Sequence, residues 1–142
     1  MAASLSFEGA TSFCADPAFS GRIGVGASNS PTSATLSGDR DAILEAKQIF
    51  DEEKTFARVL NVDTAYHSHH MLACAEPYLQ SIKACNIQVN PPRNDCIWIS
   101  SVRGDIDLLE DGLQTLKGEY WVDNMVNPVL FSQLSRTSRS PQ

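Results

Sequence analysis

The sequence predicts an α/β fold of the α+β kind, opening with a β-α-β-β-α-β unit over residues 1–62. Three observations support this prediction. Residues 22–27 alternate Ile, Val and Ala with Arg and Gly, the turn-forming run Asn29-Ser30-Pro31 follows, and an amphipathic helical stripe starts after Asp39. Taken in order, the elements have the split pattern of a ferredoxin-like sheet with both helices on one face.

Each element of this unit has a local signal. Residues 1–5 form a strand stub, and Ser6 begins a helix that ends before Pro17. Residues 22–27 and 34–36 form a hairpin, and residues 56–62 form the last strand. The second helix should be capped by Asp39. Its expected buried stripe consists of Ala42, Ile43, Ala46, Ile49 and Phe50.

A second part is expected over residues 63–133. Helical spacing predicts a helix from His67 to Ala84 that must accommodate Pro77. A short buried strand follows at 96–99, then a solvated acidic loop at 104–112, and a helix at 119–125 that Asn127-Pro128 ends. Residues 134–142 lack hydrophobic periodicity and hold no bulky apolar residue after Leu134, which predicts a disordered tail over this segment.

Composition limits the classes of function. The 142 residues, 42% of them hydrophobic, suffice for one domain or part of one. A net charge of −6 disfavours binding to nucleic acid or to an anionic membrane. Without an apolar run of ~18 residues or a secretory signal, a cytoplasmic protein is expected. The four cysteines form no C-x-x-C pair, so we expect reduced, partly buried packing residues and no zinc.

All three histidines lie in one short segment, D-T-A-Y-H-S-H-H-M at residues 63–71. Histidine suits proton transfer because its ordinary pKa is about 6.5. Three interpretations stay open from spacing alone: a general base, a metal site using His67 with His70 or Met71, or surface histidines. The metal interpretation lacks an H-E-x-x-H pattern or a Cys pair, and the nucleophilic one lacks a G-x-S-x-G elbow.

Three segments in order resemble a known family. They are A-S-N-S-P-T-S-A-T-L-S-G-D at 27–39, the histidine segment at 63–71, and Y-W-V-D-N-M-V-N-P-V-L-F at 120–131. Together they resemble the acyltransferase domain of type I polyketide synthases, closest to the fungal iterative reducing kind. The resemblance implies a ferredoxin-like small subdomain at 1–62 and part of an α/β-hydrolase-like large subdomain at 63–133.

The resemblance also implies roles for individual residues. In the family a serine in a G-H-S-x-G elbow attacks malonyl-CoA, and a histidine takes its proton before the acyl group passes to the phosphopantetheine thiol of an acyl carrier protein. His67 corresponds to that general base, and the backbone carbonyl of Asn127 corresponds to its orienting acceptor. The stretch that selects malonyl over methylmalonyl corresponds to Thr64, Ala65, Tyr66 and Ser68. No bound cofactor or metal is implied.

The family's elbow, oxyanion hole and malonyl-binding arginine lie upstream of the matched segments. We therefore expect this chain alone to form no acyl-enzyme and to leave apolar surface uncovered around Trp98, Trp121 and Phe131. The alternative is a non-catalytic module that binds a carrier protein or a complementary synthase segment.

Overall fold

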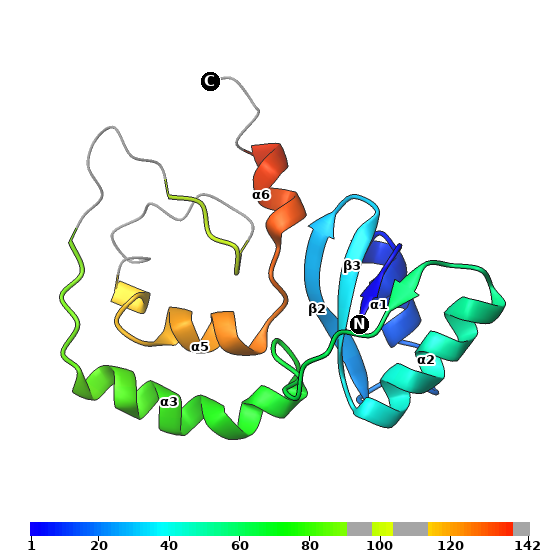
Figure 1. Cartoon of the computed structure of the whole chain (residues 1–142). Helices are drawn as coiled ribbons and strands as arrows, with labels where there is room; N and C mark the ends of the chain where they lie inside the picture. The colour runs from blue at the N-terminus through cyan, green and yellow to red at the C-terminus, as the bar shows by residue number, and fades with distance from the viewer. Residues whose placement is uncertain (91–97, 104–113, 138–142) are drawn as a thin grey trace.

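A four-stranded antiparallel sheet organises the first part of the chain in the computed structural model, which describes residues 1–90, 98–103 and 114–137. The strands are β1 (Ala2–Ala3), β2 (Ile23–Ser30), β3 (Ser33–Gly38) and β4 (Ala57–Arg58), in the spatial order β2-β3-β1-β4. Helices α1 (Phe7–Cys14) and α2 (Arg40–Glu52) complete the β-α-β-β-α-β unit (Figure 1). The predicted fold class is confirmed.

The two helices begin differently. At α1 the Ser6 hydroxyl accepts a hydrogen bond from the Gly9 N–H at 3.0 Å, a normal N-cap. Asp39 occupies the N-cap position of α2, but its side chain makes no capping hydrogen bond. Its Oδ1 instead lies 2.6 Å from Nε2 of His70. The expected cap is therefore wrong in this detail, because a histidine from a distant segment competes for the carboxylate.

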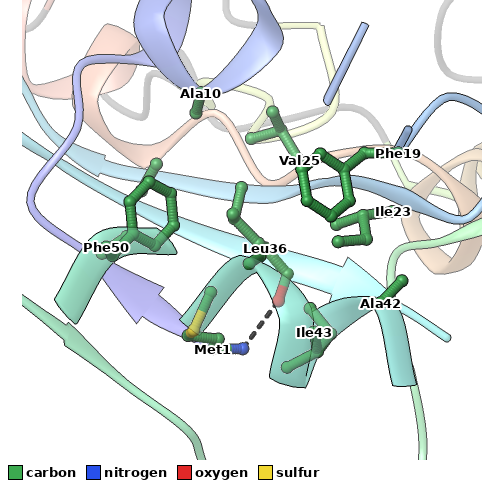
Figure 2. Close-up of a cluster of buried hydrophobic side chains, with 12 residues drawn as sticks. Met1, Ala10, Phe19, Ile23, Val25, Leu36, Ala42, Ile43 and Phe50 are labelled. Atoms are coloured by element: carbon green, nitrogen blue, oxygen red, sulfur yellow. Dashed lines mark hydrogen bonds between the residues drawn. The ribbon is translucent and has the colours of Figure 1, made fainter. Parts of the chain in front are cut away.

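The core lies between the helices and one face of the sheet. Phe50 of α2 and Leu36 of β3 are the largest of its fully buried side chains, and Ala10 of α1 is also fully buried (Figure 2). The Phe13 ring packs between Phe19 and Phe50, with ring centres 4.7 and 4.6 Å apart. Four of the five residues in the predicted stripe of α2 are buried, and Ile49 is partly buried.

The hairpin returns to α2 through a position that requires glycine. The φ angle of Gly38 is 156°, and a Cβ placed there would lie 2.1 Å from the carbonyl oxygen of Arg22. The N–H of Asp39 donates to that same oxygen at 2.8 Å. The start of α2 is thus fixed to the start of β2.

Strand β4 is much shorter than the predicted strand at 56–62. Its two residues pair with the two residues of β1, and beside them the Ser4 N–H donates to the carbonyl of Phe56 at 2.9 Å. Beyond them Val59, Leu60 and Val62 are 41%, 41% and 62% exposed. Their β-branched and apolar composition indicated a strand. The pairing of β4 stops at Arg58, however, because β1 is only two residues long.

The second part is built from helices. A 3₁₀ turn, η1 (His69–Met71), leads into α3 (Leu72–Ala84), which continues through Pro77. Helix α3 packs along α5 (Glu119–Val126), and Lys83 pairs with Glu119 at 2.8 Å. The hydrogen bond from Lys83 lowers the pKa of the Glu119 carboxyl. None of the described helices is long and apolar enough to cross a lipid bilayer.

Several predictions for this part need correction. The α-helix starts at Leu72 rather than His67, and a 3₁₀ turn from His69 precedes it. Ser68 caps that turn by accepting from the His70 N–H at 3.3 Å. Residues 134–137, predicted to belong to a disordered tail, are helical within α6 (Phe131–Thr137). Residues 138–142, the acidic loop at 104–112 and most of the strand expected at 96–99 lie outside the described residues.

The expected apolar exposure is partly observed. Trp121 is 40% and Phe131 is 59% exposed, whereas Trp98 is half-buried with its ring centre 5.1 Å from that of Tyr120.

The cysteines differ from one another in exposure. Burial raises the pKa of the Cys14 thiol to about 11. Cys74 and Cys85 are exposed on or next to α3, contrary to the prediction of partly buried packing residues.

Because the thiolate is the nucleophile, we expect iodoacetamide at neutral pH to alkylate Cys74 and Cys85 and to spare Cys14. Peptide mass spectrometry checks this result, with alkylation in denaturant as the control. Equal labelling of Cys14 in the native chain would contradict it.

Candidate active site

His67 lies in the connection between the sheet unit and the helical part, in an unusual backbone conformation. Its φ angle is 55°, a left-handed value that is uncommon outside glycine and clusters at functional sites. The His67 N–H donates to the carbonyl of Met125 at 3.2 Å. Next to it the Ser68 hydroxyl is buried and donates to the carbonyl of Ala65 at 2.6 Å. These hydrogen bonds hold the backbone that carries the imidazole.

The imidazole of His67 is anchored through one nitrogen. Its Nδ1 lies 2.8 Å from the carbonyl oxygen of Asn124 and 3.1 Å from that of Asn127. A carbonyl only accepts hydrogen bonds, so in the neutral ring Nδ1 carries the proton and donates it. Nε2 is then the basic nitrogen, which is the arrangement that a general base needs.

These two carbonyls are available because α5 ends there. The last carbonyls of an α-helix have no partner within the helix. Pro128 disfavours a helical conformation for Asn127, which is extended at φ −97° and ψ 162°. The negative end of the helix dipole also favours the positive imidazolium that forms when Nε2 takes a proton. Sequence reasoning named Asn127 but missed Asn124, whose place in the last turn before Asn-Pro was the available signal.

The end of α5 is joined to the sheet. Val129 pairs in parallel with Ala27, its carbonyl accepting from the Ser28 N–H at 2.8 Å and its N–H donating to Gly26 at 2.9 Å. Gly26 lies at a β-bulge of β2, where a Cβ would come within 3.1 Å of Ser37. This close approach favours glycine at position 26. The pairing of Val129 with β2 places the end of α5, whose carbonyls bind His67, at the edge of the sheet.

The four other predicted site residues have separate environments. Thr64 and Ala65 line a groove of about 490 Å³ beside α2. The Tyr66 side chain is 59% exposed, and its carbonyl accepts from the Ser37 hydroxyl at 2.6 Å. Ser68 is buried and caps η1. The structure thus brings Asn127 to His67, while Tyr66 presents its ring to the surface.

Comparison with solved structures shows the class of fold. The acyltransferase domain from module 8 of the salinomycin polyketide synthase superposes with a TM-score of 0.82 at 23% identity, over 96% of this chain and 30% of that one. The malonyl CoA-acyl carrier protein transacylase from Burkholderia pseudomallei gives 0.78 at 17% identity, over 96% and 44%. The chain therefore has the fold of part of an acyltransferase domain.

The sequence comparisons then show the family. The chain belongs to the acyl transferase domain family, whose model matches residues 4–141. It is 64% identical over 138 residues to the hybrid PKS-NRPS synthetase apdA of Emericella nidulans and 59% identical over 138 residues to a highly reducing polyketide synthase of Alternaria alternata. Each match covers 97% of this chain, but only 4% and 6% of those proteins. The chain is thus a segment of a polyketide synthase acyltransferase domain.

Proposed function

We propose that this chain supplies the general base for transferring a malonyl group from malonyl-CoA to the phosphopantetheine of an acyl carrier protein. The observation that carries the proposal is the anchoring of His67 Nδ1 by two main-chain carbonyls, which leaves Nε2 to exchange protons. The nucleophilic serine would come from another part of the domain, because the sequence of this chain holds no G-x-S-x-G elbow.

The proton transfers follow from this geometry. As the serine Oγ bonds to the thioester carbon, its proton passes to Nε2 of His67. The carbon–sulfur bond then breaks, and the imidazolium gives the proton to the departing CoA thiolate. In the second half Nε2 accepts the proton of the carrier's thiol as the sulfur attacks the acyl-serine, and returns it to the serine. The carbonyls of Asn124 and Asn127 stabilise the positive charge of the imidazolium in both half-reactions.

Substrate choice is part of the same proposal. Tyr66 precedes the base, and the hydrogen bond from Ser37 to its carbonyl fixes the backbone at that point. A bulky ring there would crowd a branched α-carbon, so malonyl is preferred to methylmalonyl. A single methyl group is worth only about 1–3 kcal/mol of discrimination. Thr64, Ala65 and Ser68 shape the loop that carries the Tyr66 ring. We also place the reaction in the cytoplasm.

An adduct experiment tests the division of labour between the two parts of the domain. The purified chain is incubated with malonyl-CoA and analysed by intact mass. We expect no malonyl adduct from the chain alone, because a base without a nucleophile forms no acyl-enzyme. Adding the serine-bearing part of the domain from the Emericella nidulans synthetase should give a hydroxylamine-labile adduct on that partner. A stoichiometric adduct on this chain alone, or none on the reconstituted pair, would contradict the proposal.

A second candidate function rests on the groove beside α2. Its walls include the apolar side chains of Leu44, Val59, Leu60 and Val62, all more than 40% exposed. Exposed apolar surface of this kind is typical of an interaction site, so a non-catalytic module is the alternative. A pulldown with a cognate carrier protein separates the two candidates: binding that survives His67→Ala without reconstituted transfer favours the module.

A further inference from the structure

Two histidines that the proposed reaction does not use converge on one carboxylate. His69 and His70, both in η1, approach Asp39 at the N-cap of α2. Nε2 of His70 lies 2.6 Å and Nε2 of His69 lies 3.4 Å from Oδ1 of Asp39. The two imidazole rings meet edge to face, with their centres 4.5 Å apart. Residues 31 positions apart in the sequence thus gather three potential metal ligands at one point.

The donor set is that of a borderline transition metal. Two imidazole nitrogens and one carboxylate oxygen suit zinc, and they also accept nickel and cobalt. The three ligand atoms already lie within 4.8 Å of one another. Around a tetrahedral zinc, neighbouring ligand atoms lie about 3.3 Å apart, which the His69–Asp39 distance of 3.4 Å matches. The His70–Asp39 pair, at 2.6 Å, would have to open by roughly 0.7 Å, a small rotation for a half-exposed ring.

The three side chains are also free to take this role. The carboxylate of Asp39 makes no capping hydrogen bond to α2, so binding a metal would not disturb that helix. The side chains of Asp39, His69 and His70 are 35%, 41% and 42% exposed, which leaves room for water at a fourth position. His67 faces the end of α5 instead and is not part of the set.

We propose that Asp39, His69 and His70 form a binding site for a divalent transition metal of the zinc class. No metal was expected from the sequence, and the pairs that its spacing offered, His67 with His70 or Met71, differ from the set that the fold brings together. The third ligand is Asp39, which the fold brings from a distant segment of the chain into contact with His70. The site is independent of the proposed acyl transfer, and a bound ion would clamp η1 to the start of α2.

Zinc titration of the 142-residue chain tests the proposal. Isothermal titration calorimetry with Zn²⁺ should give one site per chain, and Co²⁺ should produce the visible absorption of a nitrogen- and oxygen-ligated ion. Zn²⁺ should also raise the melting temperature, since it binds only the folded arrangement. Asp39→Asn, His69→Gln and His70→Gln should each weaken binding by roughly tenfold or more. Absence of a binding isotherm in the unsubstituted chain would overturn the proposal.

Two controls make the test specific. His67→Gln removes a neighbouring histidine, and Glu53→Gln removes an exposed carboxylate at the far end of α2; both should keep the zinc affinity of the unsubstituted chain. Circular dichroism confirms that each variant is folded. Should a ligand variant fail to fold, the other two still decide the outcome. Unchanged affinity in folded Asp39→Asn, or an equal loss in His67→Gln, would show non-specific chelation and overturn the site.

Discussion

Replacing His67 by Asn is expected to slow malonyl transfer by roughly 10²–10⁴-fold, the usual contribution of a general base. The substitution removes Nε2 and leaves the serine hydroxyl without a proton acceptor. Asn is chosen because it tolerates the left-handed φ of 55° better than most residues, so the loop should keep its conformation. The measurement is single-turnover transfer from malonyl-CoA to a carrier protein. The enzyme is an Emericella nidulans acyltransferase domain in which residues 1–137 of this chain replace the matching segment.

Two further variants make the His67 experiment decisive. Gln80→Ala changes an exposed side chain of α3 and should retain full activity. His67→Gly fits the backbone equally well and leaves a space for free imidazole, which should restore part of the lost rate. If His67→Asn stayed folded and transferred malonyl at the unsubstituted rate, His67 would not be the base. Loss of activity together with a lowered melting temperature would indicate a structural role instead.

The sequence was most informative where side-chain periodicity and packing agree. The helix after Asp39 was predicted with its buried face, because Ala42, Ile43, Ala46 and Phe50 recur at helical spacing and all meet the sheet. The hairpin was predicted because Pro31 lies in a turn between two apolar runs. The order of these elements then fixed the β-α-β-β-α-β topology, since few arrangements of six such elements bury both helices on one sheet face.

Local patterns could not supply contacts between distant segments. The strand expected at 56–62 stops at Arg58 because its partner β1 is two residues long, and pairing length is a property of the partner. Asn124 reaches Nδ1 of His67 across 57 residues, and it does so through a main-chain carbonyl that any residue at that position would provide. No side-chain pattern marks such a contact. The meeting of Asp39 with His69 and His70 also joins distant segments, although side chains make that contact.

Leu36→Ala is expected to lower the free energy of unfolding by about 2–5 kcal/mol, the range for deleting a buried leucine side chain. Leu36 is fully buried in β3, at the centre of the cluster that joins both helices to the sheet (Figure 2). The loss combines the burial free energy of the deleted apolar atoms with the cost of the cavity left among rigid neighbours. Urea unfolding of the 142-residue chain, followed by far-UV circular dichroism, measures the change.

Leu44→Ala is the matched control, because it makes the same chemical change at a side chain of α2 that is 51% exposed. We expect this variant to differ from the unsubstituted chain by no more than about 0.5 kcal/mol, as surface substitutions usually do. The contrast between the two leucines isolates burial as the cause. Equal destabilisation by both would mean that the groove around Leu44 is closed in solution, and no destabilisation by Leu36→Ala would mean that β3 does not pack against α1 and α2.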